Sequence, residues 1–140
     1  MRRLLAMSLV ALLTGLPAWG QNSVELLKEQ AEKADGKKEI SLSVKIAEQQ
    51  LKAANAAYDN GKTEEALEAV QDVLEYSTRA AKESTETGKK MKHTEIALRK
   101  IADKLEDIRK SLAVDDRPPV AEAIRKIEAA RNDLLFRMFK

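Results

Sequence analysis

The apolar residues of this chain recur at alternating steps of four and three, which is the spacing of one face of an α-helix. The clearest stripes lie on either side of a turn at 60–63. The first stripe consists of Ile40, Val44, Ala47, Leu51, Ala54 and Tyr58, and the second of Leu67, Val70, Leu74, Ser77 and Ala81. Asn60 and Gly61 both tolerate a positive φ, so they stop the first helix. The pattern predicts an antiparallel helical hairpin with helices over about 38–59 and from 64 onward.

The stripe of the second hairpin helix changes phase near Gly88. A helix unbroken from 64 to 112 would be about 73 Å long, which is far longer than a globule of this size. Weak helix formers also precede the glycine. We therefore predict a turn over 86–89 and a further helix over 90–113. A bent continuous helix is the alternative.

Two more helices complete the predicted fold. An apolar stripe predicts a short helix over 21–34. Near the other end, Arg117 and Pro118 are expected to be extended and Pro119 to begin the last helix, because a residue before proline avoids the helical region. Four long helices of matched length with short connections predict an all-α fold, an up-down four-helix bundle with an additional short N-terminal helix.

Residues 1–20 have the layout of a secretory signal peptide. Two arginines open the chain, and the mostly apolar run at 4–16 is too short to cross a bilayer as a helix. Ala18 and Gly20 then place small residues before a cut at Gln21. An uncleaved N-terminal anchor is the alternative.

Export would place a single helical domain, 21–140, in the periplasm or outside the cell, with no transmembrane segment after cleavage. The formal net charge of +2 would then vanish, since residues 1–20 contain two arginines and no acidic residue. A chain with balanced charge gives no support for nucleic-acid binding or for a general attraction to anionic membranes. Because there is no cysteine, its stability depends on packing rather than on disulfides.

No catalytic, metal or cofactor set can be assembled from the sequence. His93 is the sole histidine and cysteine is absent, which argues against ordinary zinc, copper or haem sites. There is no Gly-x-Ser-x-Gly nucleophile elbow. Acidic residues stand next to basic ones at surface spacing, as Glu95 does with Arg99. We therefore predict a protein that is not an enzyme and that uses no cofactor.

The basic segment around the predicted turn is one candidate binding site. Lys89, Lys90 and Lys92 lie near the start of a predicted helix, where backbone N–H groups and ammonium groups can hold a phosphate or carboxylate. It is not a P-loop, because Glu83 stands where the first glycine of that motif belongs. The alternative is a solvated basic segment that complements the negative end of the preceding helix.

The C-terminal end of the last predicted helix is the second candidate. Leu134 and Met138 face one way, Leu135 and Phe139 another, and Phe136 a third. One interpretation is that several neighbours, including the first helix, bury this end. The other is an exposed patch through which Leu135, Phe136 and Phe139 contact a second copy, a protein partner or a membrane surface.

The predicted hairpin resembles a single tetratricopeptide repeat over about 51–74. Tyr58, Gly61 and Ala66 stand at the spacing of that repeat, followed by Leu67. The departures are Leu51 at the usual tryptophan position, Asn55 at the first glycine position and Thr78 at the closing proline position. The resemblance implies two helices packed closely around a tight turn, and it does not by itself imply a peptide-binding groove.

Together these patterns predict an exported, non-enzymatic helical bundle that acts by protein–protein contact, as a scaffold, adaptor or stress-type binding protein. Its partner would be an unknown protein or a second copy of the chain. The alternative function is a small-ligand or anion-binding module that uses the basic segment at 89–92.

Overall fold

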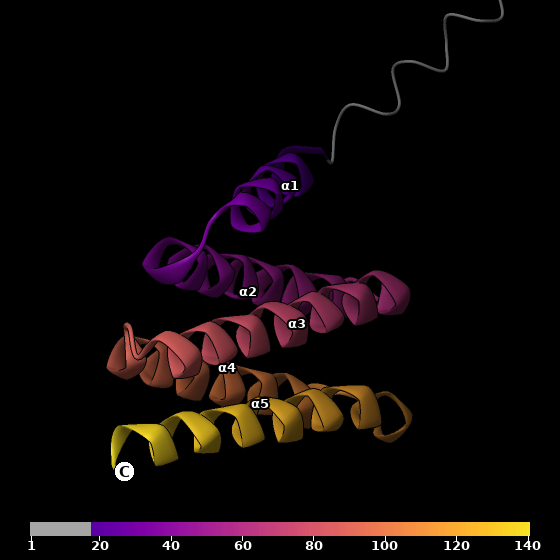
Figure 1. Cartoon of the computed structure of the whole chain (residues 1–140). Helices are drawn as coiled ribbons and strands as arrows, with labels where there is room; N and C mark the ends of the chain where they lie inside the picture. The colour runs from indigo at the N-terminus through magenta and orange to yellow at the C-terminus, as the bar shows by residue number, and fades with distance from the viewer. Residues whose placement is uncertain (1–17) are drawn as a thin grey trace, which may run out of the picture.

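Helices make up almost all of the fold that the computed structural model describes, which covers residues 18–140 (Figure 1). They are α1 (Ala18–Lys33), α2 (Gly36–Asp59), α3 (Thr63–Thr87), α4 (Met91–Ser111) and α5 (Arg117–Met138), with the 3₁₀ turn η2 (Val114–Asp116) before α5. No strand occurs within 18–140. The predicted all-α class is therefore confirmed. Most of the predicted signal peptide lies outside the described residues, and the expected cut before Gln21 falls in the first turn of α1.

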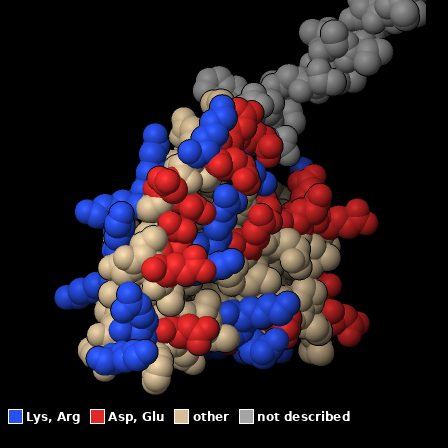
Figure 2. Space-filling view, viewed as in Figure 1, with Lys and Arg blue, Asp and Glu red and all other residues tan. Residues whose placement is uncertain are grey.

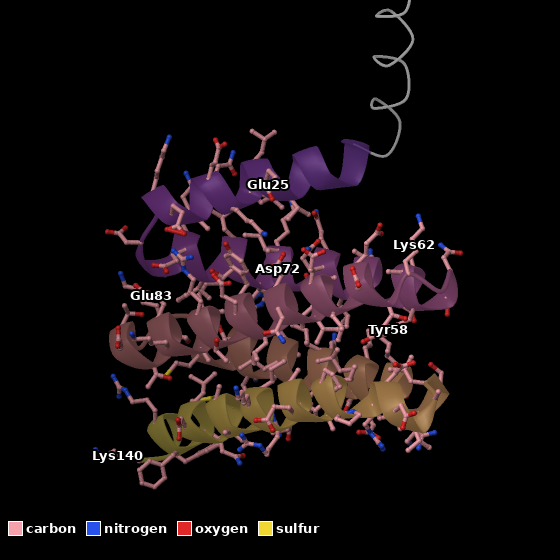
Figure 3. All side chains as sticks on the ribbon, turned by 90° about the vertical axis from the view of Figure 1, so that its right-hand side faces the viewer. Glu25, Tyr58, Lys62, Asp72, Glu83 and Lys140 are labelled. Carbon is pink, nitrogen blue, oxygen red and sulfur yellow. The ribbon has the colours of Figure 1, made fainter. Side chains whose placement is uncertain are left out.

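The helices from α2 to α5 pack as two antiparallel hairpins, and the chain direction alternates from each helix to the next (Figure 1). α2 packs along α3, and α4 packs along α5. The hairpins meet mainly through α3 and α5, while α2 and α4 touch over a smaller area. α1 lies obliquely on the outer side of α2, so α1 and α5 are on opposite sides of the molecule (Figures 1 and 3).

The predicted stripes form the core. Its largest fully buried side chains include Ile46, Val70, Val73, Leu98, Leu105, Ile127 and Leu134. Burying an aliphatic side chain of this size stabilises the fold by about 1.5–3 kcal/mol. A second, smaller cluster joins Ile40 and Val44 of α2 to Ala80 of α3 and Ala97 of α4. The two alanines let the helices approach closely there, so α2 and α4 are held together within their first halves.

The predicted turns are present, with one correction. Gly61 and Gly88 have φ of 71° and 72°, the left-handed conformation that ends a helix, so the bent continuous helix is wrong. The expectations that Arg117 and Pro118 are extended and that Pro119 begins the last helix are also wrong, because α5 begins at Arg117, whose φ and ψ are −74° and −35°. Pro118 fits the first turn of α5, because the N–H groups of a first turn have no intrahelical acceptor and the N–H that proline lacks is not needed there. The Nε of Arg117 donates to the Leu112 carbonyl at 2.9 Å, which holds this helical start.

Arg79 of α3 ties α1 and α2 to the hairpin. Its Nε donates to Glu39 of α2 at 3.0 Å, and its Nη1 donates to Glu32 of α1 at 3.1 Å. The hydrogen bonds from Arg79, and then its charge, lower the pKa of the Glu32 carboxyl. The side chain of Glu39 is only 15% exposed, so removing Arg79 would leave a largely buried carboxylate without its donor.

Tyr76 is the apolar centre of the same junction. Its ring is buried, with the Lys28 ammonium 5.9 Å from the ring centroid and the Arg79 guanidinium 5.6 Å from it. Lys28 of α1 also donates to Asp72 at 2.8 Å, and Gln50 of α2 donates to the same carboxylate oxygen at 2.8 Å. Asp72 is a residue of α3, so these two hydrogen bonds join α3 to α1 and to α2. Cation–π contacts and charge-assisted hydrogen bonds therefore fix where α1 crosses the hairpin.

The Arg79→Met variant is expected to lower the free energy of unfolding by about 1–3 kcal/mol, because Glu39 loses a charge-assisted hydrogen bond. Hydrogen exchange of the α1 amides should accelerate more than that of α4 or α5. Urea unfolding and exchange mass spectrometry measure both effects. Arg125→Met is the matched control, since it removes an arginine that bonds only to exposed Glu122, and should leave the unfolding midpoint unchanged. Equal effects of the two substitutions would refute this role.

The contact of α1 should also weaken in acid. The pKa of Glu32 is lower in the folded protein than its ordinary value of 4.5, so the Glu32 contribution is complete above that value and is lost as the pH falls through the folded pKa. Amide protection factors in α1 should therefore decrease below about pH 4.5. In Glu32→Gln this part of the pH dependence should be absent. An unchanged pH profile in that variant would contradict the assignment.

Candidate functional site

A groove of about 640 Å³ lies between α2 and α4. Val44 and Ala97 belong to one buried cluster that joins the first halves of the two helices, and farther along the groove separates them. Its floor consists of Leu51, Ile101 and Ile108, core residues that are at most 5% exposed. The groove thus has a deep apolar floor that belongs to the rigid core rather than to a loop.

The rim of the groove is charged on both sides. Its charged residues are Glu48, Lys52 and Asp59 of α2 and Lys100, Lys104 and Asp107 of α4. None of these six side chains forms an ion pair with another residue in the described range 18–140. Elsewhere buried charges are paired, as Arg131 of α5 is with Glu95 of α4 at 2.8 Å. The rim charges are therefore free to contact a ligand.

These charges are ordered along the groove. α2 and α4 run in the same direction (Figure 1), so Lys100 lies nearest the starts of the two helices and Asp59 at the far end, with Lys52, Lys104 and Asp107 between them. Glu48 is the single acidic residue of the part nearer those starts. From Glu48 to Asp59 the α2 backbone rises by about 16 Å. The groove is therefore long enough for several residues of an extended chain, and its charge changes sign along its length.

The structure brings the two sequence-predicted sites to one end of the molecule. There the start of α2, the α3–α4 turn and the end of α5 meet. Three hydrogen bonds join these segments, from Gly36 N to Glu83 at 3.0 Å, from Lys90 Nζ to Ser41 Oγ at 2.7 Å and from Arg137 Nε to the Thr85 carbonyl at 3.1 Å. Figure 3 shows Glu83 and Lys140 at this end, and Tyr58 and Lys62 at the other.

The three lysines predicted to bind an anion are arranged differently from one another. Lys89 and Lys92 are exposed, whereas Lys90 is half-buried and donates to Ser41. Lys90 precedes α4 with a φ of 54°, a left-handed conformation that is uncommon for a residue with a side chain. The ammonium group of Lys90 is thus already engaged, and anion binding by this segment stays a prediction.

The C-terminal residues divide between core and surface. Leu134 is buried, Met138 packs against the core and Leu135 is half-buried. Phe136 and Phe139 are 73% and 81% exposed. The interpretation that neighbours bury this whole end is therefore wrong for both phenylalanines, because α1, the expected cover, lies on the far side of the hairpin (Figure 1).

Charge is segregated between the two ends of the bundle. Figure 2 shows lysine and arginine along the left-hand edge and acidic residues along the right-hand edge. We call the first the basic end, and it carries Lys37, Lys38, Lys89, Lys92, Arg137 and Lys140 at the termini of α2, α4 and α5. The α2–α3 and α4–α5 turns, at the other end, carry Asp59, Glu64, Glu65, Asp115 and Asp116. The net charge of the chain does not reveal this separation, because it is a sum that contains no information on position.

The groove was missed because its rim resembles an ordinary solvated helix face. Lys52, Asn55 and Asp59 stand at helical spacing beside an apolar stripe, and so do Lys100 and Lys104. Such a pattern normally marks exposure to water. Its significance depends on the distance between two helices that are far apart in the sequence.

Other features of the described residues point to structure rather than chemistry. Burial, and then the charge of Asp116, raise the pKa of Tyr58, whose hydroxyl is enclosed and whose ring packs on the core. Within residues 18–140 no His, Asp or Glu side chains gather into a metal-binding group. In the same range no helix is both long and apolar enough to span a bilayer.

Comparisons with protein-family models, curated proteins and solved structures found no match to this chain. The resemblance of 51–74 to a tetratricopeptide hairpin therefore stays a prediction.

Gly88→Ala is expected to destabilise the protein and loosen the end of α5. A side chain in the left-handed region costs about 1–2 kcal/mol, and a Cβ at this position would lie 3.3 Å from Nη2 of Arg137. Gly61→Ala is the control, since Gly61 has nearly the same φ and nothing within 4 Å of such a Cβ. Both variants should unfold at lower urea concentration, but only Gly88→Ala should accelerate amide exchange over 134–139. The same exchange in both variants would argue against this junction.

Proposed function

We propose that the protein is an exported, non-enzymatic up-down four-helix bundle that binds a peptide segment of a partner protein in the groove between α2 and α4. The observation that supports this function best is the combination of an apolar floor with rim charges of both signs that have no ion-pair partners in the described part of the chain. Such a scaffold or adaptor would work by contact alone.

The shape of the groove favours a chain segment over a small molecule. A small-ligand pocket encloses most of its ligand within apolar walls. Here only the floor is apolar, and both walls are lined with long charged side chains. A peptide can place an apolar side chain on Ile101 and Leu51 while its flanking residues remain near water.

The order of the charges defines the class of peptide. An acidic residue of the ligand would face Lys52, Lys100 and Lys104, and a basic residue would face Asp59 and Asp107. An apolar residue would lie between them, over the floor. Complementary charges at a rim mainly set the specificity and the rate of association.

The alternative function, binding of a small anion by Lys89, Lys90 and Lys92, has less support. Lys90 already donates to Ser41, and the other two ammonium groups are exposed. Peptide binding in the groove is therefore the better supported function.

Selection of displayed random peptides against the purified protein tests it. The recovered peptides should carry an apolar residue flanked by an acidic residue on one side and a basic residue on the other. Lys52→Glu/Lys104→Glu should weaken their binding by at least about tenfold, because like charges would face each other. Isothermal titration calorimetry measures the dissociation constants.

Lys45→Glu/Lys110→Glu is the matched control. It changes the same helices by the same charge, but neither residue lines the groove, so binding should be unchanged. Failure to select any such peptide, or equal loss in both variants, would rule out the groove as the binding site.

A further inference from the structure

Phe136 and Phe139 are exposed on a helix end that is itself held firmly. Phe136 lies in the last turn of α5 and Phe139 is the residue that caps this helix, so both stand at the end of the same element. The neighbouring Leu134 and Met138 anchor this turn in the core, and Arg137 bonds to the Thr85 carbonyl. The two rings are therefore presented to the surroundings by a fixed element.

Basic side chains from three separate segments lie at the same end of the bundle as these rings. Arg137 and Lys140 come from α5 itself. Lys89 comes from the α3–α4 turn and Lys92 from the first turn of α4, next to the end of α3 that Arg137 contacts, and the start of α2 brings further lysines to the same end. Lys89 reaches that start, since its Nζ lies 3.5 Å from where a Cβ of Gly36 would be.

The acidic residues of this end offset the basic ones only in part. Glu83 accepts a hydrogen bond from the Gly36 backbone N–H, and Glu39 is bonded to Arg79. Asp35 and Glu86 are exposed at the same end. The lysines and arginines outnumber these four acids, so the basic end has a positive field although the predicted mature chain is neutral overall.

We propose that the basic end binds an anionic lipid surface, with Phe136 and Phe139 entering the headgroup region and the surrounding lysines and arginines contacting lipid phosphates. Apolar insertion and charge attraction are each weak, but together they give stable attachment. This surface is separate from the groove, and its binding does not depend on the function proposed for the groove.

A lipid surface fits this end better than a second copy of the chain does. The acidic end of a second copy would complement the charge. However, Val114 is the one strongly exposed large apolar side chain on the acidic turns, so it offers little apolar surface to two phenylalanine rings. A bilayer supplies both negative charge and an apolar layer beneath it.

Co-sedimentation with vesicles of phosphatidylcholine, with and without phosphatidylglycerol, tests the proposal. The exported protein should bind the anionic vesicles and not the neutral ones. High salt should release it, since the Debye length falls from ~10 Å at 0.1 M to ~3 Å at 1 M. Lys89→Gln/Lys92→Gln should weaken binding about fivefold for each charge removed, and Phe136→Ser/Phe139→Ser by about tenfold or more.

Matched changes at the acidic end provide the control. Lys62→Gln and Val114→Ser remove a lysine and an exposed apolar residue there and should leave vesicle binding unchanged. All variants should begin at the same N-terminal residue and should be shown to have the same melting temperature before their vesicle binding is compared. The predicted mature chain lacks Trp19, so in Phe139→Trp anionic vesicles should shift the emission of the single tryptophan to the blue, whereas Val114→Trp should show no such shift.

Equal losses of vesicle binding at both ends, or no blue shift of the emission in Phe139→Trp, would overturn the proposal. An absence of binding to anionic vesicles would overturn it too. If the protein then self-associates or binds an acidic peptide, and the phenylalanine substitutions abolish that binding, the surface serves that partner instead. Groove variants such as Lys52→Glu/Lys104→Glu should keep vesicle binding, which separates this test from that of the groove.

Discussion

The arrangement of this molecule depends on the close contact that Ile40 and Val44 of α2 make with Ala80 of α3 and Ala97 of α4. Small side chains at this crossing let the helices of the two hairpins approach near one end. Beyond it, the hairpins remain joined through α3 and α5, whereas the groove separates α2 from α4. A single contact thus produces both a closed end, where four helix termini meet, and an open groove along the rest of the two helices.

The two ends of the bundle differ in charge because of where the turns lie. The alternating chain direction puts the α2–α3 and α4–α5 turns at one end and the α3–α4 turn and C-terminus at the other (Figure 1). Acidic residues start α3 and fill η2, while lysines flank the α3–α4 turn. The acids at the start of α3 complement its dipole, and so do the lysines that follow its end, but the same lysines stand at the start of α4, where the dipole disfavours them. Helix dipoles therefore do not explain the charge separation, because each end of the bundle holds both helix starts and helix ends.

The position of α1 depends on polar contacts more than on apolar packing. α1 contributes the apolar side chains of Val24 and Ala31 to the core. Polar contacts around Tyr76 and Arg79, however, set the direction in which α1 crosses α2. Such contacts are directional and depend on protonation, in contrast to the nondirectional packing that joins α2 to α3. α1 is accordingly the helix whose attachment should respond most to acid.

The sequence by itself determined the helices, their turns and the faces that they bury, since helical periodicity, glycines at positive φ and proline are local properties. It also pointed to the C-terminal phenylalanines and the lysines near Gly88 as unusual. Tertiary structure alone decided that these two segments meet at one end, that Phe136 and Phe139 stay exposed, and that Lys52 and Lys104 line one groove. These features depend on the distance and crossing of helices that are remote in sequence, and neither periodicity nor net charge contains that information.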